Sequence, residues 1–255
     1  MKTKLHFIIA SLILLFMAGG QSICLAAEDW HWRDGGDNDQ PNKKFSGVKG
    51  TQSDPYLNSS CQDMADLAYL INTGNDFTAK YFRQTCDLVF NDDLIVNGEY
   101  NKEKEGTFKK YISPGNSGVI DDEFEGYFDG GGYTMKGLYL YSVRKEEVVS
   151  GLFGYVEKGE IRNVNLDEVY VSILNYENRN HYYCGIIAGL AENCRITNCH
   201  VTNAYVSQQQ IESRVYAYCG GVVGSAKEVT ISNCSFEGII FGDGNSSLGG
   251  IVGHL

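Results

Sequence analysis

The densest group of residues that could do chemistry is acidic. It comprises Asp121, Asp122, Glu123, Glu125 and Asp129. Carboxylates this close together could coordinate Ca²⁺ or share the acid and base roles of glycoside hydrolysis. A solvated acidic turn between two strands has the same composition, and this is the interpretation that we favour. We therefore assign no metal and no catalytic residue to the group.

The familiar catalytic motifs are absent from the chain. It contains no His-Glu-x-x-His, no Gly-x-Ser-x-Gly and no phosphate-binding Gly-x-x-x-x-Gly-Lys loop. No Cys-x-x-Cys pair with zinc spacing occurs either. We therefore expect no cofactor and no metal, and we expect a protein that is not an enzyme.

Two pairs of cysteines share one spacing. Cys184 and Cys219 are 35 residues apart, and so are Cys199 and Cys234. Equivalent side chains of neighbouring parallel strands run alongside each other, which is a poor approach for a disulfide. The spacing therefore predicts buried thiols stacked one above the other. Seven cysteines remain once a leader containing Cys24 is removed, so at least one of them has no partner within the chain.

Two tyrosine-rich segments lie at the same offset, from Ile173 to Tyr183 and from Gln208 to Tyr218. We expect both to project side by side as loops. Loops on a rigid scaffold often carry binding, and tyrosine and arginine are enriched in contact surfaces. The predicted ligand-binding residues are Tyr176, Arg179, His181, Tyr182, Tyr183, Arg214, Tyr216 and Tyr218. The alternative is that these tyrosines only pack the loops onto the scaffold.

The elements that would position these residues repeat along the chain. A glycine signature occurs as Gly151-Leu152-Phe153-Gly154, Gly221-Val222-Val223-Gly224 and Gly250-Ile251-Val252-Gly253, with a degenerate copy at Ile186-Ile187-Ala188-Gly189. A second element follows, as Ile161 to Leu166, Ile196 to Val201 and Ile231 to Phe236, and Met135 to Leu140 fits it one step earlier. Apolar residues alternate with polar ones there, which is the period of a half-buried strand. A third element includes Val169 to Ser172 and Ala204 to Ser207.

Three short strands per repeat cannot bury an apolar face alone, whereas stacked repeats build one continuous core. The sequence therefore predicts an all-β fold, a right-handed parallel β-helix or solenoid. Asn163, Asn198 and Asn233 occupy one place in the repeat, and we expect them to stack as a hydrogen-bonded ladder at a tight turn. In the same way Leu152, Ile187 and Val222 should form one internal column, and Val164, Cys199 and Cys234 another.

With these repeats the chain resembles the GLUG-repeat proteins of bacteria, which take their name from a Gly-Leu-x-Gly signature. The resemblance covers about half of the chain, from Phe128 onward. It implies a secreted or surface-attached protein whose repeats carry no known chemistry. Some long chains of this type are peptidases or adhesins.

One helix is predicted upstream of the repeats. Ser60 is placed to cap it, and Met64, Leu67, Ala68 and Ile71 form one apolar stripe. A solenoid needs its open end covered, so we expect this helix to form a short N-terminal cap. We expect residues 97–120 to form an extended loop.

The termini and the composition set the cellular context. Residues 1–27 read as a secretory signal peptide, residues 28–49 as a polar lead-in and residues 50–255 as the repeat domain. Ser22-Ile23-Cys24 is a poor lipoprotein signal because a large residue precedes the cysteine. The formal net charge of −11 argues against nucleic acid, and no later segment is long and apolar enough for a membrane span. The chain ends just after a fresh signature, so we expect a partner or further chain to cover that end.

These observations predict a non-enzymatic module, secreted or at the cell surface, with an adhesive or structural role. Its expected ligand is a carbohydrate or a protein. The alternative is a polysaccharide lyase or hydrolase on the same scaffold. That alternative needs an acid cluster facing a groove, with an arginine or lysine against it in a lyase.

Overall fold

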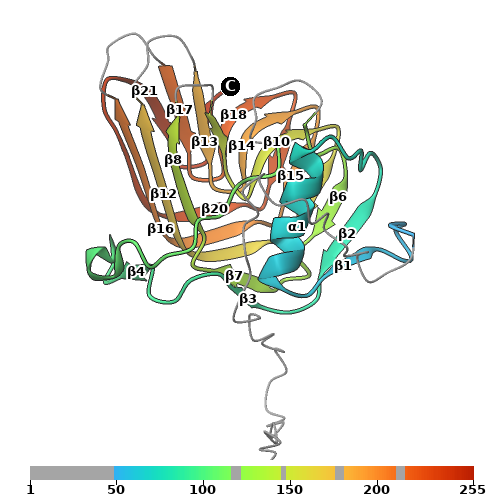
Figure 1. The fold of residues 1–255 in the computed structure, drawn as a ribbon. Helices are drawn as coiled ribbons and strands as arrows, with labels where there is room; N and C mark the ends of the chain where they lie inside the picture. The colour runs from blue at the N-terminus through green and yellow to red at the C-terminus, as the bar shows by residue number, and fades with distance from the viewer. Residues whose placement is uncertain (1–48, 116–121, 145–147, 176–180, 211–215) are drawn as a thin grey trace, which may run out of the picture.

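The computed structural model describes residues 49–115, 122–144, 148–175, 181–210 and 216–255. This part of the chain consists mainly of short β-strands, with one α-helix and one 3-10 turn (Figure 1). The all-β fold class predicted from the alternating apolar residues is confirmed.

Each repeat carries four strands rather than three. The first contains β10 (Phe153–Glu157), β11 (Glu160–Arg162), β12 (Asn165–Asn175) and β13 (Tyr182–Gly185). The second contains β14 (Ala188–Glu192), β15 (Arg195–Thr197), β16 (His200–Gln210) and β17 (Tyr216–Gly220). The third contains β18 (Val223–Lys227), β19 (Thr230–Ser232), β20 (Ser235–Gly242) and β21 (Asn245–Gly249), and β22 (Val252–His254) follows.

Equivalent strands of successive repeats pair in parallel. Ile161 lies opposite Ile196, which lies opposite Ile231, and Phe153, Ala188 and Val223 are paired in the same way. The parallel pairing predicted from the 35-residue spacing is therefore confirmed for these segments. The N-terminal strands extend the sheets: β1 (Tyr56–Asn58), β2 (Tyr81–Gln84), β3 (Leu88–Val89), β6 (Tyr127–Asp129), β7 (Thr134–Lys136), β8 (Tyr139–Arg144) and β9 (Val148–Ser150).

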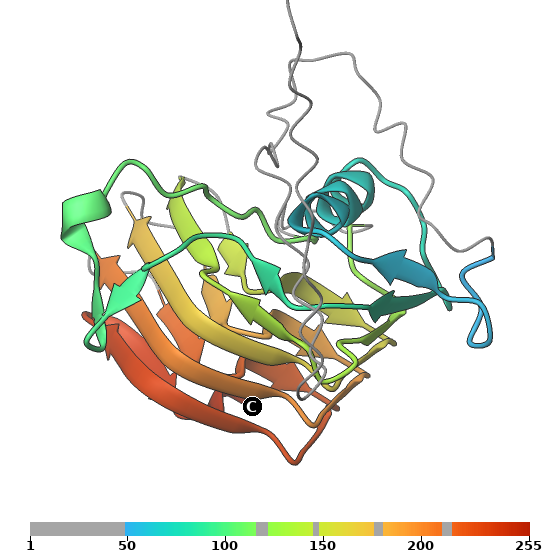
Figure 2. The same cartoon turned by 90° about the horizontal axis from the view of Figure 1, so that it is seen from below.

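Four parallel sheets result. Their strand orders are β10-β14-β18-β22, β1-β2-β6-β11-β15-β19, β3-β7-β12-β16-β20 and β9-β13-β17-β21, with β8 also paired to β12. Each of the four sheets contributes buried residues to one main hydrophobic core. Figure 2 shows the long strands β12, β16 and β20 lying side by side across the molecule. The first predicted column is buried, since Leu152, Ile187 and Val222 are 0% exposed. In the second, Val164 and Cys199 are buried but Cys234 is half-buried.

The second element of each repeat is not one strand, as predicted, but two. The chain turns at Asn163, Asn198 and Asn233, whose φ angles are 54°, 54° and 51°. Asparagine tolerates this left-handed conformation better than most residues, so the strand divides there into β11 and β12. The segment from Met135 to Leu140 was also predicted in the wrong register. Met135 pairs with Leu166, and Phe128 is the residue opposite Ile161.

The second glycine of the signature allows two sheets to meet at close range. A Cβ atom at Gly189 would stand 2.7 Å from the backbone nitrogen of Ser150, and one at Gly253 would stand 2.7 Å from that of Cys219. Real Cβ atoms do not approach a backbone so closely. The signature is thus a packing requirement at the corner between the β10 and β9 sheets.

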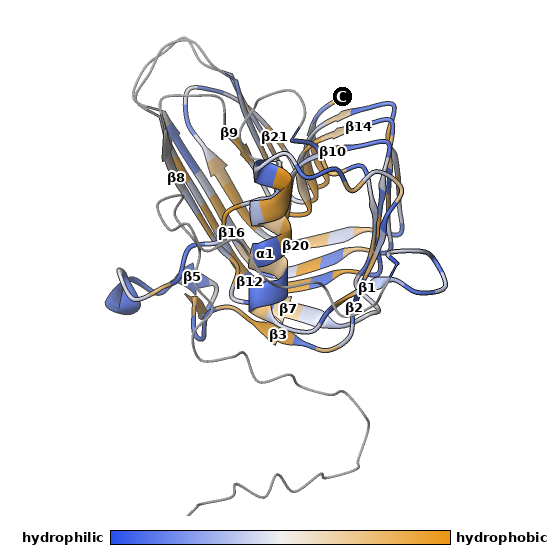
Figure 3. Cartoon of the chain, turned by 45° about the vertical axis from the view of Figure 1, so that its right-hand side comes forward, coloured by the Kyte–Doolittle hydropathy of each residue, from blue (hydrophilic) through white to orange (hydrophobic). Residues whose placement is uncertain are grey.

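The predicted helix is confirmed as α1 (Cys61–Asn72). The Ser60 side chain accepts a hydrogen bond from the Asp63 backbone N–H at 3.1 Å, so it caps the helix as expected. Met64, Leu67 and Ile71 are at most 2% exposed and join the main core. The helix lies against the N-terminal strands, and Figure 3 shows hydrophobic segments in the strands behind it.

The segment predicted as a loop from residue 97 is largely built into the fold. β4 (Ile95–Val96) and β5 (Glu99–Tyr100) form an antiparallel hairpin, followed by the 3-10 turn η1 (Lys102–Lys104). Leu94, Phe108 and Tyr139 make a second small core there. Tyr111 is buried, and its hydroxyl donates to the Leu152 carbonyl at 3.2 Å. Residues 116–121 lie outside the described part.

Candidate functional site

Five aromatic side chains form a cluster on the outer face of the β13–β17 region. The rings belong to His181, Tyr183, Tyr216, Tyr218 and His254. We call these five residues the aromatic cluster. Its ring centroids lie 4.4 Å apart for Tyr218 and His254, 5.5 Å for Tyr183 and Tyr218, and 5.9 Å for His181 and Tyr216.

The backbone explains why these rings gather. Tyr183 and Tyr218 are paired in the parallel register of β13 and β17, so their rings stack on the same face. Side chains alternate between the two faces of a strand, so the residues next to Tyr183 and Tyr218 along each strand point inward. Tyr216 is 52% exposed, and His181 and His254 are also exposed. The cluster therefore presents ring edges, phenol hydroxyls and imidazoles to solvent.

The structure brings together four of the predicted binding residues, His181, Tyr183, Tyr216 and Tyr218. Tyr182 was assigned to the surface, and this is wrong, because its side chain is 0% exposed within the main core. Tyr176, Arg179 and Arg214 lie outside the described residues. The two predicted loops are also shorter than expected, because strand β12 continues to Asn175 and strand β16 to Gln210.

His254 was missed by sequence reasoning. The repeat places it opposite Ser225, a small residue, so the 35-residue spacing gave no sign that an imidazole would reach Tyr218. Only the contact between β17 and β22, which belong to different sheets, brings these two rings together.

The acidic group divides in space. Glu123 and Glu125 meet Glu157 from the next repeat, with one oxygen atom of each within 4.8 Å of the others. The Lys158 ammonium lies 3.0 Å from a carboxylate oxygen of Glu125 and 3.0 Å from one of Glu157. The Lys158 ammonium therefore offsets the charge of Glu125 and Glu157, and an acidic surface group alone identifies no metal site. Asp121 lies outside the described residues.

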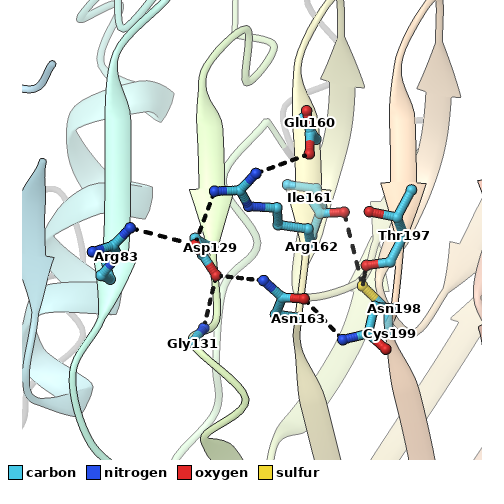
Figure 4. A network of polar contacts seen from close by, with 10 residues as sticks. All are labelled: Arg83, Asp129, Gly131, Glu160, Ile161, Arg162, Asn163, Thr197, Asn198 and Cys199. Carbon is cyan, nitrogen blue, oxygen red and sulfur yellow. Dashed lines mark hydrogen bonds and ion pairs between the residues drawn. The ribbon is translucent and has the colours of Figure 1, made fainter. Parts of the chain in front are cut away.

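Asp129 stands apart from this group, at the head of the asparagine ladder (Figure 4). Its Oδ1 accepts hydrogen bonds from Asn163 Nδ2 at 2.9 Å and from the Gly131 N–H at 3.0 Å. The ladder continues as Asn198 Nδ2 donates to Asn163 Oδ1 at 2.8 Å, and Asn233 Nδ2 to Asn198 Oδ1 at 2.7 Å. The predicted ladder is therefore confirmed, with Asp129 as its first acceptor.

Two arginines meet the second oxygen of Asp129. Arg162 Nη2 lies 3.1 Å from Oδ2 and Arg83 Nη2 lies 3.7 Å from it. Burial alone would raise the pKa of Asp129, but the hydrogen bonds from Asn163 and Gly131 and the Arg162 guanidinium hold it below its ordinary value. Asp129 thus stays ionised and is occupied by structural donors, so it is poorly suited to act as a general acid.

The prediction of buried, stacked thiols is confirmed for Cys184 and Cys219, whereas only Cys199 of the second pair is buried. Cys184 lies opposite Cys219, and these two and Cys199 are buried free thiols, while Cys234 is a half-buried free thiol. Cys86 is disulfide-bonded. A hydrogen bond to Cys219 and burial raise the pKa of the Cys184 thiol. A hydrogen bond from Cys199 lowers the pKa of Cys234 to about 7, because that bond stabilises the Cys234 thiolate.

No known family's sequence profile matches the chain, and no curated protein matches it. A solved structure from Bacteroides ovatus, described as a putative immunoglobulin A1 protease, is similar over 79% of this chain and 72% of its own. The sequence identity is 16% and the TM-score is 0.38. Among the described residues, no helix has the length and apolar character needed to cross a bilayer.

Proposed function

We propose that this chain is a non-enzymatic carbohydrate-binding module, secreted or held at the cell surface, on a right-handed parallel β-solenoid of the GLUG-repeat type. The solenoid is supported by the parallel register of equivalent strands through successive repeats. The observation that carries the binding role is the aromatic cluster, which gathers five rings on one outer face.

The chemistry of the cluster suits a sugar chain. Tyrosine and histidine combine an apolar ring, whose edge can contact the C–H groups of a pyranose, with a polar group for its hydroxyls. The rings are supported by paired strands and by each other, so little side-chain entropy is lost on binding. The net charge of −11 disfavours a polyanionic ligand, which leaves neutral polysaccharides as the preferred class.

The described acidic groups support binding rather than hydrolysis or lysis of such a chain. Asp129 accepts three hydrogen bonds and forms an ion pair with Arg83. Glu125 is held ionised by hydrogen bonds from Thr78 and Lys158, which lower its pKa. Both carboxylates are engaged in holding neighbouring repeats together. The lyase or hydrolase alternative gains no support from them.

The test is binding to a panel of neutral polysaccharides, with Tyr216→Ala and Tyr218→Ala as site variants. We expect each variant to weaken binding about tenfold or more with an unchanged melting temperature, since alanine removes a stacking ring. Phe241→Ala is the matched control, because Phe241 is 48% exposed but lies on β20 of another sheet. Binding that survives both tyrosine substitutions, or that falls equally with the control, contradicts the proposal.

A further inference from the structure

A separate pocket lies on the outer face of β2, β6 and β11. Its walls include Gln52, Pro55, Tyr81, Arg83, Tyr127, Asp129, Glu160 and Arg162. Figure 4 shows four of these side chains, Arg83, Asp129, Glu160 and Arg162, side by side on neighbouring strands. The pocket encloses about 90 Å³. This is below the rough range of 300–1,000 Å³ of enclosed small-molecule sites, so a ligand would lie partly across its open mouth.

One wall of the pocket is a rigid aromatic surface. Tyr81 and Tyr127 are paired in the parallel register of β2 and β6, and their rings stack 4.4 Å apart at an interplanar angle of 14°. Both side chains are half-buried. Because each ring supports the other, the wall exists before any ligand arrives. Glu160 continues the same row on β11, directly after Tyr127.

The other wall alternates in charge. Arg83, Asp129 and Arg162 follow one another across the paired strands. Asp129 fixes both arginines from behind, and Arg162 Nη1 also lies 3.6 Å from Glu160 Oε1. The Arg83 side chain is 49% exposed and that of Arg162 is 39% exposed. A guanidinium has five N–H donors, so both retain donors that can point into the pocket.

From these contacts we infer that the pocket binds one neutral sugar unit. The aromatic wall provides an apolar surface for the ring of a pyranose. Arg83 and Arg162 donate hydrogen bonds to the hydroxyl groups of the sugar, and Glu160 accepts hydrogen bonds from those hydroxyl groups. Neighbouring hydroxyls of a sugar match the two parallel N–H groups of one guanidinium edge.

Charge balance argues for a neutral ligand rather than an acidic one. The two arginines are offset by Asp129 and Glu160, so the ionic groups that line the pocket carry no net charge. An anionic ligand would be attracted by the arginines and repelled by the carboxylates at similar distances, so the two electrostatic energies would largely cancel. This inference does not rest on the aromatic cluster, because the pocket lies on a different sheet and uses none of the same residues.

The experiment measures monosaccharide binding to the whole secreted protein. The probes are the neutral methyl glycosides of glucose, galactose, mannose and fucose, with sodium glucuronate as the acidic counterpart. We expect at least one neutral glycoside to bind with a Kd of about 1 mM or tighter in calorimetry or ligand-detected NMR. It should bind more tightly than glucuronate.

Arg83→Gln is the site variant, because its half-exposed side chain can be replaced without opening the core. We expect it to weaken binding of the neutral glycoside about tenfold, the effect of losing charge-assisted hydrogen bonds. Arg195→Gln is the matched control, since Arg195 lies opposite Glu160 on β15 and is not among the residues that line the pocket. We expect this variant to bind as the parent does.

Three outcomes overturn the inference: no binding by any neutral glycoside, tighter binding of glucuronate, and equal loss in the two arginine variants. Loss of polysaccharide binding in Tyr216→Ala with intact monosaccharide binding would separate the two sites. The pocket and the aromatic cluster can therefore fail independently.

Discussion

At the scale of single residues, Asp129 joins three strands and the asparagine ladder through one carboxylate. Its lowered pKa means that the folded state binds this proton less readily than the unfolded chain. The stabilising effect is therefore fully present above the ordinary pKa of 3.8 and is lost as the pH falls through the folded pKa. Asp129 should thus contribute to unfolding in acid.

Replacing Asp129 by asparagine tests this role. We expect Asp129→Asn to lose about 1–3 kcal/mol of stability at pH 7, because its interactions with two guanidinium groups weaken. Stability measured by urea unfolding should also fall less steeply below pH 4 than in the parent. Asp93→Asn removes a solvent-exposed ion pair with Lys104 and should change little. An unchanged acid slope in Asp129→Asn would contradict the assignment.

Asn198 combines a left-handed φ of 54° with the central position in the ladder. Asn198→Ala removes the hydrogen bonds that its side-chain amide makes with Asn163, Asn233 and His200. It also places an alanine, which has no side-chain amide, in the left-handed conformation. We expect thermal unfolding to show a loss of about 2–4 kcal/mol. Asn198→Gly keeps the turn but loses the ladder, so it should be less destabilising than alanine by about 1 kcal/mol. Equal losses would show that the turn is not strained.

Tyr182 shows where sequence reasoning failed at this scale. The residue was grouped with its neighbours by composition, but strand alternation decides which side chains face inward. Tyr182 has the same parity as Cys184, which the repeat had already placed inside, so the signal was present. Asp129 was wrongly grouped with Glu123 and Glu125 for a related reason. They are close in sequence, but the chain carries Asp129 away from the other two in space.

At the scale of elements, helix α1 closes the core beside the first strands. Leu67 is fully buried among core residues, so Leu67→Ala should cost about 2–5 kcal/mol by leaving a cavity. Ser60→Ala should cost about 1 kcal/mol, because the Asp63 N–H loses its acceptor. Denaturant unfolding followed by circular dichroism measures both. Ser60→Asp retains an acceptor and should unfold like the parent, and a large loss there would contradict the capping role.

The helix and the strand pairing were predictable because both follow from local periodicity. Apolar spacing fixed the helix, and equality of residue types at a distance of 35 fixed the register. The number of strands per repeat was not predictable in this way. The division at Asn163 depends on a backbone angle, and the hairpin at Ile95–Tyr100 pairs outside the repeat. The pocket on β2, β6 and β11 draws on residues from 52 to 162, which no motif connects.

At the scale of the whole molecule, stacking repeats places the cysteines in distinct environments. Burial raises the pKa of Cys61 and of Cys194 to about 12, so neither forms a thiolate readily at neutral pH. Cys234 is half-buried in the third repeat and has its pKa lowered to about 7 by Cys199. The fold thus protects five described thiols and leaves one reactive.

Thiol titration of native and denatured protein tests this arrangement. Among the described free thiols, native protein at pH 7.5 should show one that reacts fast, because only Cys234 combines a lowered pKa with access to solvent. Denaturation should release the remaining free thiols of the six described here, namely Cys61, Cys184, Cys194, Cys199 and Cys219. Cys234→Ser should abolish the fast phase, whereas Cys194→Ser should leave it intact. A Cys184–Cys219 or Cys199–Cys234 disulfide in mass mapping, or a fast phase that survives in Cys234→Ser, would show that stacking does not set thiol reactivity.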